Sequence, residues 1–406
     1  KTTLHNVPRI RDVMALVDIV NHLGGEAKFI DDHTVTVENR LTKFHIPFEF
    51  AARTRVSFML LAPLLKTFGK ASVPNPGGCR LGARPVDRLA YTAERIGAKV
   101  EYNSNDGYYY ITLSKPHAAV IKFAKITHTG TELAIMNTVF VKGISTIKNA
   151  ALEPEIDDMI EFFNKAGAEI VRQGNNIVVN GVSELLGVDM TVQFDRNEAV
   201  SYIILSALFN GGIVVKNVSA PDIAFFLNKF QKAGFTYENN KEANEFRIKV
   251  PKIIKPVNVE TAPHPGFITD WQPMWALLMA HAKGESKIHE TVFENRFGYV
   301  EELRKFGAKI SYYDPHVFDP DVVYQFNISH VNTTLLQAIC IHGPTKLHNG
   351  IVKMTDIRAG ACLVMAALLA SGESMVSGAE QIERGYEDLI SKLRALGADI
   401  RSENLL

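Results

Sequence analysis

The stretch Lys305-Phe306-Gly307-Ala308, with the strand-like residues 308–312 that follow it, carries the pattern that decides the fold. In it an amphipathic helix stops at a glycine and leads into a strand. The same junction occurs six times, at Gly24, Gly97, Gly167, Gly234, Gly307 and Gly397. Subtraction of these positions gives spacings of 73, 70, 67, 73 and 90 residues. Because self-similarity at a regular period marks repeated structural modules, the sequence predicts six copies of one α/β repeat.

The helix before each glycine is predicted from the spacing of its apolar residues. Ile156, Met159, Ile160 and Phe163, for example, recur at the intervals of three and four that place side chains on one helix face. The glycine then occupies the position where helices commonly end in a left-handed conformation, and a strand is expected after each one. A second helix per repeat is expected at residues 54–68, 131–141, 199–209, 270–282 and 359–370.

Six repeats divide naturally into three plus three, with a boundary near Asp195. A chain of 406 residues is long enough for two domains with sizeable cores. We therefore expect two α/β lobes, residues 1–194 and residues 195–406.

The composition limits the classes of partner. Lysine plus arginine equals aspartate plus glutamate, 44 of each, so no global field favours nucleic acid or a membrane and an anionic partner must be bound locally. The apolar stretches are too short to span a bilayer, and the start has no secretory pattern. Three cysteines do not make a disulfide framework, and the histidines lack metal-ligand spacing. We expect a cytoplasmic globular protein without a metal site.

The stretch most informative about chemistry is Pro-Gly-Gly-Cys-Arg-Leu-Gly-Ala-Arg-Pro-Val-Asp, residues 76–87. It places Cys79 between Arg80 and Arg84, and neighbouring positive charge favours the thiolate form of a cysteine. The glycines allow the backbone to approach a ligand closely, and arginine suits phosphate and carboxylate. This stretch is interpreted either as a reactive thiol beside an anion or as a surface turn with an incidental cysteine, and spacing alone does not decide between them.

Another possible anion site begins a helix in the first lobe. Residues 125–131 combine Lys125, Thr127, His128 and a glycine, which suits a phosphate cradle at a helix N-terminus. The same residues also suit a helix start capped by a hydroxyl group.

In the second lobe, the rigid stretch 262–270 delivers Asp270, and three further loops each place an arginine beside an acid. These arginines are Arg296, Arg358 and Arg384; Asp356 is the acid beside Arg358. A single such pair is commonly a surface ion pair of small energy. Three equivalent loops that all present arginine instead indicate a shared site for phosphate and carboxylate.

Five motifs together resemble the family of UDP-N-acetylglucosamine enolpyruvyltransferases, and they occur in family order along the whole chain. They are residues 76–87, Glu-Pro-Glu-Ile (153–156), Thr-Ala-Pro-His-Pro-Gly-Phe (261–267), Glu-Thr-Val-Phe-Glu-Asn-Arg (290–296) and Arg-Gly-Tyr-Glu (384–387). The resemblance implies an inside-out α/β barrel of two domains, each built of three βαβαββ repeats. It also implies a transferase without a cofactor that moves enolpyruvyl from phosphoenolpyruvate to the 3′-hydroxyl of UDP-N-acetylglucosamine and releases phosphate. That reaction is the first committed step of peptidoglycan synthesis, so cell-wall biogenesis, cell shape and cell division are the processes implied.

The resemblance also assigns residues. Cys79 is implied as the group that protonates the methylene carbon of phosphoenolpyruvate and that fosfomycin alkylates, and Asp270 as the group that contacts and deprotonates the attacking hydroxyl. Arg84, Arg358 and Arg384 are implied to hold phosphate and carboxylate. The other substrate-binding residues implied are Arg55, Pro85, Val86, Asp87, Arg88, Lys125, Ile126, Thr127 and His128 for the nucleotide, Val292 and Phe293 for the sugar, and Arg296 and Asp356 beside them.

The chain departs from the family at its start. It begins after the Ser-Lys-Asn-Ala-Ala segment whose Lys-Asn pair binds phosphoenolpyruvate in the family, and Met59 and Leu89 stand where tryptophan and histidine are usual. Two alternatives therefore stay open. One is a paralogue that binds a UDP-sugar without turning it over. The other is a shikimate-3-phosphate enolpyruvyltransferase, against which Cys79 argues because that enzyme does not use this cysteine loop.

Overall fold

The computed structural model describes residues 1–77, 86–326, 328, 336–354 and 356–403. Its described residues form two compact units, one up to Gln193 and one from Phe194 onward. Both units mix helices with strands, which confirms the α/β class. Cys79, Arg84 and Pro85 lie outside the described residues, so their predicted roles stay predictions from sequence.

The predicted βαβαββ repeat is complete in the last repeat of the first unit. Its elements are β7 (Val120–Lys122), α5 (His128–Thr138), β8 (Gly143–Lys148), α6 (Pro154–Lys165), β9 (Glu169–Gln173) and β10 (Asn176–Gly181). Strand β7 runs parallel to β8, and β10 lies antiparallel between β8 and β9.

The second unit contains a repeat with the same order and the same pairing. Its elements are β15 (Val259–Glu260), η3 (Thr269–Trp271), α9 (Gln272–Met279), β16 (Gly284–His289), α10 (Gly298–Lys305), β17 (Lys309–Tyr312) and β18 (Ala338–Gly343). Here β15 is parallel to β16, and β18 lies antiparallel between β16 and β17. Two repeats far apart in sequence therefore fold in the same way.

The remaining elements are distributed over both units. In the first they are β1 (Thr2–His5), α1 (Arg11–His22), β2 (Glu26–Phe29), β3 (Val35–Glu38), α2 (Phe48–Ala51), η1 (Arg55–Leu60), α3 (Leu61–Phe68), β4 (Lys70–Pro74), α4 (Asp87–Arg95), β5 (Lys99–Asn103), β6 (Tyr108–Thr112) and β11 (Asp189–Thr191). In the second they are α7 (Arg196–Leu208), β12 (Val214–Lys216), η2 (Pro221–Ile223), α8 (Ala224–Lys232), β13 (Thr236–Asn240), β14 (Glu245–Lys249), α11 (Pro320–Val323), β19 (Ile351–Lys353), α12 (Ile357–Leu369), β20 (Met375–Ser377), η5 (Ala379–Arg384) and α13 (Leu389–Ala395).

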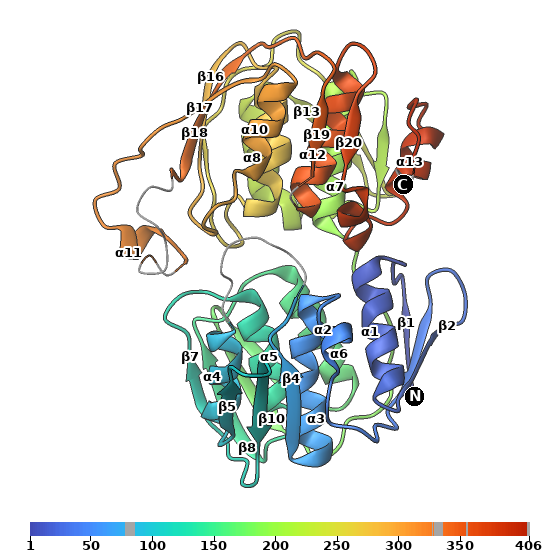
Figure 1. Ribbon diagram of the computed structural model, residues 1–406, viewed down its shortest axis with the longest axis vertical. Helices are drawn as coiled ribbons and strands as arrows, with labels where there is room; N and C mark the ends of the chain where they lie inside the picture. The colour runs from blue at the N-terminus through green and yellow to red at the C-terminus, as the bar shows by residue number, and fades with distance from the viewer. Residues whose placement is uncertain (78–85, 327, 329–335, 355, 404–406) are drawn as a thin grey trace. The chain divides into compact units, whose positions relative to one another are not determined.

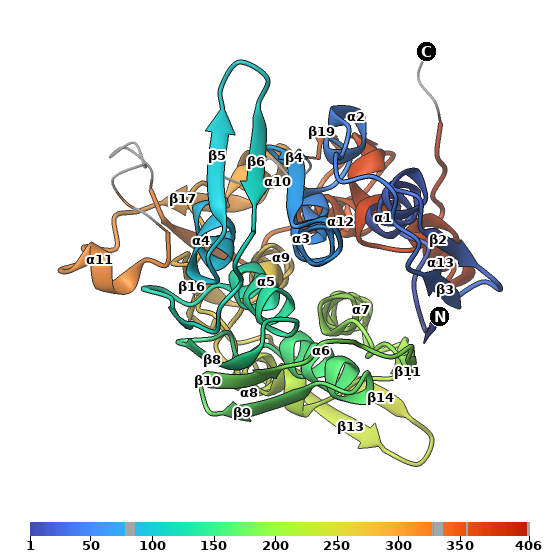
Figure 2. The same cartoon turned by 90° about the horizontal axis from the view of Figure 1, so that it is seen from below.

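Within each unit, helices fill the interior and sheets cover them. Every residue of α9 is buried, and such a helix must lie in a core because it has no polar face. The strands instead alternate between buried and exposed residues, as β14 does. Figure 1 shows α8, α10 and α12 of the second unit flanked by β16–β18 and by β19–β20. Figure 2 shows α5 of the first unit between the β8–β10 sheet and β4.

The predicted helix stops are confirmed. All six repeat glycines have φ between 90° and 102°, the left-handed region that glycine adopts without steric cost. The strand expected after Gly397 is wrong, because residues 398–403 form none. The polar residues 401–403 cannot supply the apolar alternation of a half-buried strand, and Arg394 Nε instead donates to the carbonyl of Ile400.

One difference in helix type matters for the site. The helix expected at 270–282 begins as the short 3₁₀ turn η3, continues as α9 and ends at Met279. Similarly, the helix expected at 54–68 begins as the 3₁₀ helix η1 before α3. None of the helices in the described part of the chain is long and apolar enough to cross a membrane.

Candidate active site

Asp270 lies in η3, where the chain passes from β15 into α9. The preceding loop is closed by backbone bonds from Ala262 N to Phe267 O at 2.9 Å and from Gly266 N to Pro263 O at 2.8 Å. Trp271 is 1% exposed, and its Nε1 donates to Asn197 Oδ1 at 3.0 Å. A buried anchor therefore follows Asp270 directly, and the Asp270 side chain itself stays 32% exposed.

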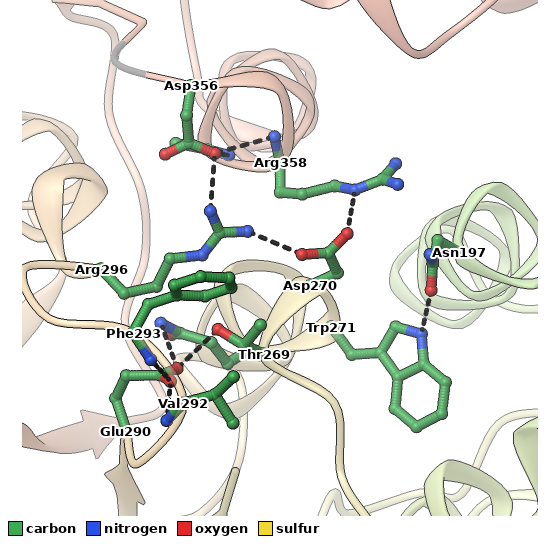
Figure 3. Close-up of polar contacts among 12 residues, drawn as sticks. Asn197, Thr269, Asp270, Trp271, Glu290, Val292, Phe293, Arg296, Asp356 and Arg358 are labelled. Carbon is green, nitrogen blue, oxygen red and sulfur yellow. Dashed lines mark hydrogen bonds and ion pairs between the residues drawn. The ribbon is translucent and has the colours of Figure 1, made fainter. Parts of the chain in front are cut away.

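Two arginines hold the Asp270 carboxylate, one at each oxygen (Figure 3). Arg296 Nη2 donates to Oδ1 at 3.0 Å, and Arg358 Nε donates to Oδ2 at 3.1 Å. Arg296 is 1% exposed, and its Nη1 lies 3.6 Å from Asp356 Oδ1. Asp356 also caps α12, because Oδ1 accepts from the backbone N–H groups of Arg358 and Ala359 at 3.0 and 3.1 Å. One buried aspartate thus fixes both Arg296 and the start of the helix that carries Arg358.

Arg358 retains donor capacity beyond its bond to Asp270. Its guanidinium carbon lies 5.2 Å from the centre of the Tyr386 ring, and Tyr386 is held by a 2.7 Å hydrogen bond with Ser201 Oγ. Within the described part of the chain, Arg358 Nη1 is buried and has no hydrogen-bond acceptor. A buried guanidinium N–H left in this way costs free energy, so the site favours an anion that would accept from it.

Glu290, for which no role was predicted, organises the turn after β16. Its carboxylate is fully buried and accepts from the backbone N–H groups of Val292 and Phe293 at 2.8 and 3.0 Å, and from the Thr269 hydroxyl at 2.8 Å. Burial raises the pKa of Glu290, and these donors and Arg296 oppose the rise. One side chain therefore fixes both the Val292–Phe293 turn and the residue before Asp270. An acid directly after a buried strand was the sequence signal for it.

Arg384 comes from an element that packs closely on α12. It is the last residue of η5, and a Cβ placed on Gly360 of α12 would approach Ile382 Cγ1 of η5 to 2.9 Å. Arg384 and Arg358 are therefore carried by two elements in direct contact.

The predicted nucleotide-binding residues of the first unit lie at helix starts. Arg55 begins η1, residues 86–88 begin α4 and residues 125–128 precede and begin α5. Thr127 Oγ1 accepts from the backbone N–H of Gly130 at 3.3 Å, so the hydroxyl-cap interpretation holds for this helix. Helices α4 and α5 pack together, with a 2.9 Å hydrogen bond from Asn137 Nδ2 to Thr92 Oγ1. Whether these helix starts bind an anion stays a prediction.

One group of possible metal ligands among the described residues was not predicted from the sequence. Glu285 on β16 and Cys340 and His342 on β18 bring ligand atoms within 4.8 Å of one another. Strand register creates this group, because Glu285 pairs with His342, and Cys340 lies two residues from His342 on the same face. Lys287 pairs with Cys340 and places a competing positive charge there.

Comparisons with known proteins agree with this architecture. Residues 1–393 match the family model described as EPSP synthase (3-phosphoshikimate 1-carboxyvinyltransferase). A UDP-N-acetylglucosamine 1-carboxyvinyltransferase of Hydrogenovibrio crunogenus is 34% identical over 405 residues, 99% of this chain and 90% of the relative. One of Campylobacter hominis is 36% identical over 402 residues, 98% of this chain and 90% of the relative.

Solved structures show the same fold. The enolpyruvyl transferase NikO from Streptomyces tendae has a TM-score of 0.84 at 24% identity, covering 98% of this chain and 90% of that one. EPSP synthase from Acinetobacter baumannii has a TM-score of 0.70 at 17% identity, with the same coverage of both chains. The full-length family match and the relatives above 30% identity together establish that this chain belongs to the EPSP synthase family of carboxyvinyltransferase enzymes, among its UDP-N-acetylglucosamine 1-carboxyvinyltransferases.

Proposed function

We propose that this enzyme transfers the enolpyruvyl group of phosphoenolpyruvate to the 3′-hydroxyl of UDP-N-acetylglucosamine and releases phosphate. The observation that carries the proposal is the Asp270 carboxylate, which is partly exposed and held in place at both oxygens by Arg296 and Arg358. The acceptor is the one named for the relatives at 34–36% identity.

The reaction is an addition followed by an elimination. A proton adds to the methylene carbon of phosphoenolpyruvate, which leaves the neighbouring carbon electron-poor, and the sugar oxygen forms a C–O bond to that carbon as it loses its proton. The bond from the same carbon to the phosphate oxygen then breaks, and the new methyl group gives back a proton to restore the double bond. One proton donor and one proton acceptor are therefore required.

Asp270 suits the role of the proton acceptor. A carboxylate oxygen has two lone pairs, so Asp270 can receive a hydroxyl hydrogen while each oxygen also accepts from an arginine. The two arginines fix the carboxylate in one orientation, and such positioning supplies much of the rate advantage in group transfer. Arg358 Nη1, buried and without an acceptor among the described residues, would donate to the phosphate or carboxylate of phosphoenolpyruvate.

The proton donor is proposed from sequence alone. Cys79, between Arg80 and Arg84, is the acid that the family resemblance implies. Arg384 is proposed to share the anion with Arg358. Residues 86–88 and 125–128 and Arg55 are proposed to hold the nucleotide. The product would enter peptidoglycan synthesis, with the roles in cell shape and division that follow from it. We place the reaction in the cytoplasm on the basis of its two substrates.

The test is phosphate release by the purified chain with phosphoenolpyruvate and either of two acceptors. We expect release with UDP-N-acetylglucosamine, together with a product heavier than the acceptor by one enolpyruvyl group in mass spectrometry, and no release with shikimate 3-phosphate. Phosphate release with shikimate 3-phosphate but not with UDP-N-acetylglucosamine would contradict the proposed acceptor. Binding of UDP-N-acetylglucosamine without any release would instead indicate a binding protein that does not catalyse the transfer.

A further inference from the structure

One hairpin of the second unit differs from its counterparts in the other repeats. The two strands after a glycine-ended helix are joined by residues 30–34, 104–107, 174–175 and 241–244 in four of the repeats. Between β17 and β18 the connection instead takes in residues 313–337, which we call the long connection. It accounts for the widest glycine spacing, from Gly307 to Gly397. Figure 1 shows α11, which belongs to it, standing away from the sheet of β16–β18.

Both described arms of the long connection bind the turn that follows β16. The backbone N–H of Glu290 donates to the carbonyl of Gln337 at 2.8 Å, and the N–H of Gln325 donates to the carbonyl of Thr291 at 2.8 Å. On the opposite side, the N–H of Thr291 donates to Thr261 Oγ1 at 2.8 Å. Thr291, which directly precedes Val292, is therefore held between Thr261, the residue after β15, and the long connection.

A buried side-chain contact strengthens the same attachment. His289 is 9% exposed, and its ring bonds Glu260 Oε2 through Nδ1 at 2.9 Å and the Tyr324 hydroxyl through Nε2 at 3.2 Å. Tyr324 stacks on Phe326 with ring centres 4.9 Å apart, and both side chains are 9% exposed. The arm that supplies Gln325 is thus anchored by two buried aromatic rings, Tyr324 before it and Phe326 after it.

We propose that Tyr324 and Gln325 are positioning residues that fix the Val292–Phe293 turn for the acceptor sugar. The inference rests on the proposed function, in which Val292 and Phe293 line the sugar site. The Glu290 carboxylate accepts from the two backbone N–H groups of this turn. Gln325 of the long connection donates its backbone N–H to the carbonyl of Thr291, the residue before the turn. A turn ordered before binding spares the acceptor the entropic cost of ordering it. Arg358 is held separately by Asp270 and Asp356. The binding of phosphoenolpyruvate should therefore be less sensitive to changes in the long connection than the binding of the acceptor.

Two variants test this. Tyr324→Phe removes only the hydroxyl that bonds His289. The second variant replaces residues 314–337 with Lys-Glu-Ala-Asn, the loop 241–244 between β13 and β14. The flanking geometry matches, because Asn240 pairs with Glu245 around that loop and Tyr313 N donates to Ala338 O at 3.1 Å around the long connection. Phe318→Ser, at a fully exposed position of the same connection, is the control.

We expect KM for UDP-N-acetylglucosamine to rise about three- to tenfold in Tyr324→Phe and further in the loop replacement. The KM for phosphoenolpyruvate, kcat and the melting temperature of Tyr324→Phe should stay close to those of the parent chain, and Phe318→Ser should match the parent throughout. An equal rise in both KM values, or an unchanged KM for the acceptor in both variants, overturns the proposal.

Hydrogen exchange separates this inference from the proposed function. Without substrate, the amides of Val292 and Phe293 should exchange faster in both variants than in the parent chain, whichever acceptor the enzyme uses. Unchanged exchange in the loop replacement overturns the positioning role by itself. Faster exchange with an unchanged KM for UDP-N-acetylglucosamine overturns the link to the acceptor. Absence of phosphate release by the parent chain would count against the proposed function, while exchange would still decide whether the turn is positioned.

Discussion

At the scale of single residues, burial separates the two arginines that hold Asp270. Arg296 is 1% exposed and lies against two aspartates, so its position suits it to holding Asp270 in place. Arg358 is 14% exposed, so its guanidinium is the more accessible of the two to a bound anion. The predicted substrate contact of Arg296 stays a prediction, and the geometry favours a structural contribution.

Arg296→Gln should therefore destabilise the protein strongly. Removing one partner from a buried ion pair leaves the remaining charges without compensation, and we expect a loss of about 3 kcal/mol in the free energy of unfolding. Urea unfolding measures it. Arg247→Gln is the matched control, since Arg247 pairs with Glu245 on an exposed strand face and should cost under about 1 kcal/mol. Similar losses for both variants would contradict the assignment.

Part of the site could be predicted from local sequence patterns, and part of it could not. Arg296, Asp356 and Arg358 were predicted from local patterns of an acid beside an arginine, and Asp270 from the rigid stretch 262–270 that delivers it. The structure joins all four by direct contacts. Glu290 was missed because the acid after the strand does not reveal its contact with Thr269, which lies 21 positions earlier in the chain. No local pattern encodes such a contact.

At the scale of elements, helix α7 is tied to helix α13 by an ion pair. Glu198 Oε1 lies 3.1 Å from Lys392 Nζ. Burial raises the pKa of Glu198, and Lys392 opposes that rise. The side chain of Lys392 is 42% exposed, so solvent screens part of the attraction.

Lys392→Met should raise the pKa of Glu198 further and make stability depend more on pH. A carboxyl whose pKa is higher in the folded than in the unfolded state favours the folded state when protonated, so its contribution is lost as pH rises through the folded pKa. The variant should lose about 1 kcal/mol of stability near pH 8 and progressively less towards pH 5. Urea unfolding across this range measures the trend.

Glu198→Gln combined with Lys392→Met provides the control, because neither side chain then titrates. The double variant should show no pH-dependent deficit relative to Glu198→Gln. If the loss of stability in Lys392→Met instead grew as the pH fell, it would contradict this prediction.

Elements that depend on local signals were predicted well. The six glycine-ended helices were found because apolar spacing and a left-handed stop are read within a dozen residues. The long connection was visible only as a wide glycine spacing, and its attachment to Thr291 and His289 could not be predicted from it. These contacts join segments that the chain brings together only after the sheet has formed.

At the scale of the whole molecule, the core of the second unit and the cores of the first unit differ in the residues that they contain. It contains both tryptophans of the chain, Trp271 and Trp275, packed around Phe226 at ring-centre distances of 5.8 and 5.9 Å. The cores of the first unit are aliphatic-rich clusters that include Phe58 and Ile147. Tryptophan fluorescence therefore reports on the second unit, and far-UV circular dichroism reports on both.

Phe226→Ala should lower the stability of the second unit selectively. Removing a buried phenylalanine costs about 3–5 kcal/mol, through lost burial and the cavity left behind. In urea, we expect the fluorescence transition to move to lower denaturant, while part of the circular dichroism transition stays at the parent midpoint. Movement of the entire dichroism transition together with fluorescence would show that the two units unfold as one cooperative system.

The order of strands within each sheet was beyond the sequence. Strand β11, just before the boundary between the two units, pairs in parallel with β1 at the start of the chain, through Thr3 and Asp189 among others. The repeat pattern alone would place β11 beside the next strand, β12, as β7 lies beside β8. Pairings between distant segments depend on tertiary packing, which a periodic pattern does not specify.

The most direct test of the account is Asp270→Asn, with Glu301→Gln on the exposed face of α10 as its control. We predict that Asp270→Asn binds UDP-N-acetylglucosamine within about threefold of the parent affinity by calorimetry, while single-turnover phosphate release slows by about 100-fold or more. Glu301→Gln should change neither quantity. Phosphate release by Asp270→Asn at the parent rate would contradict the assignment of Asp270 as the group that takes the proton from the attacking hydroxyl.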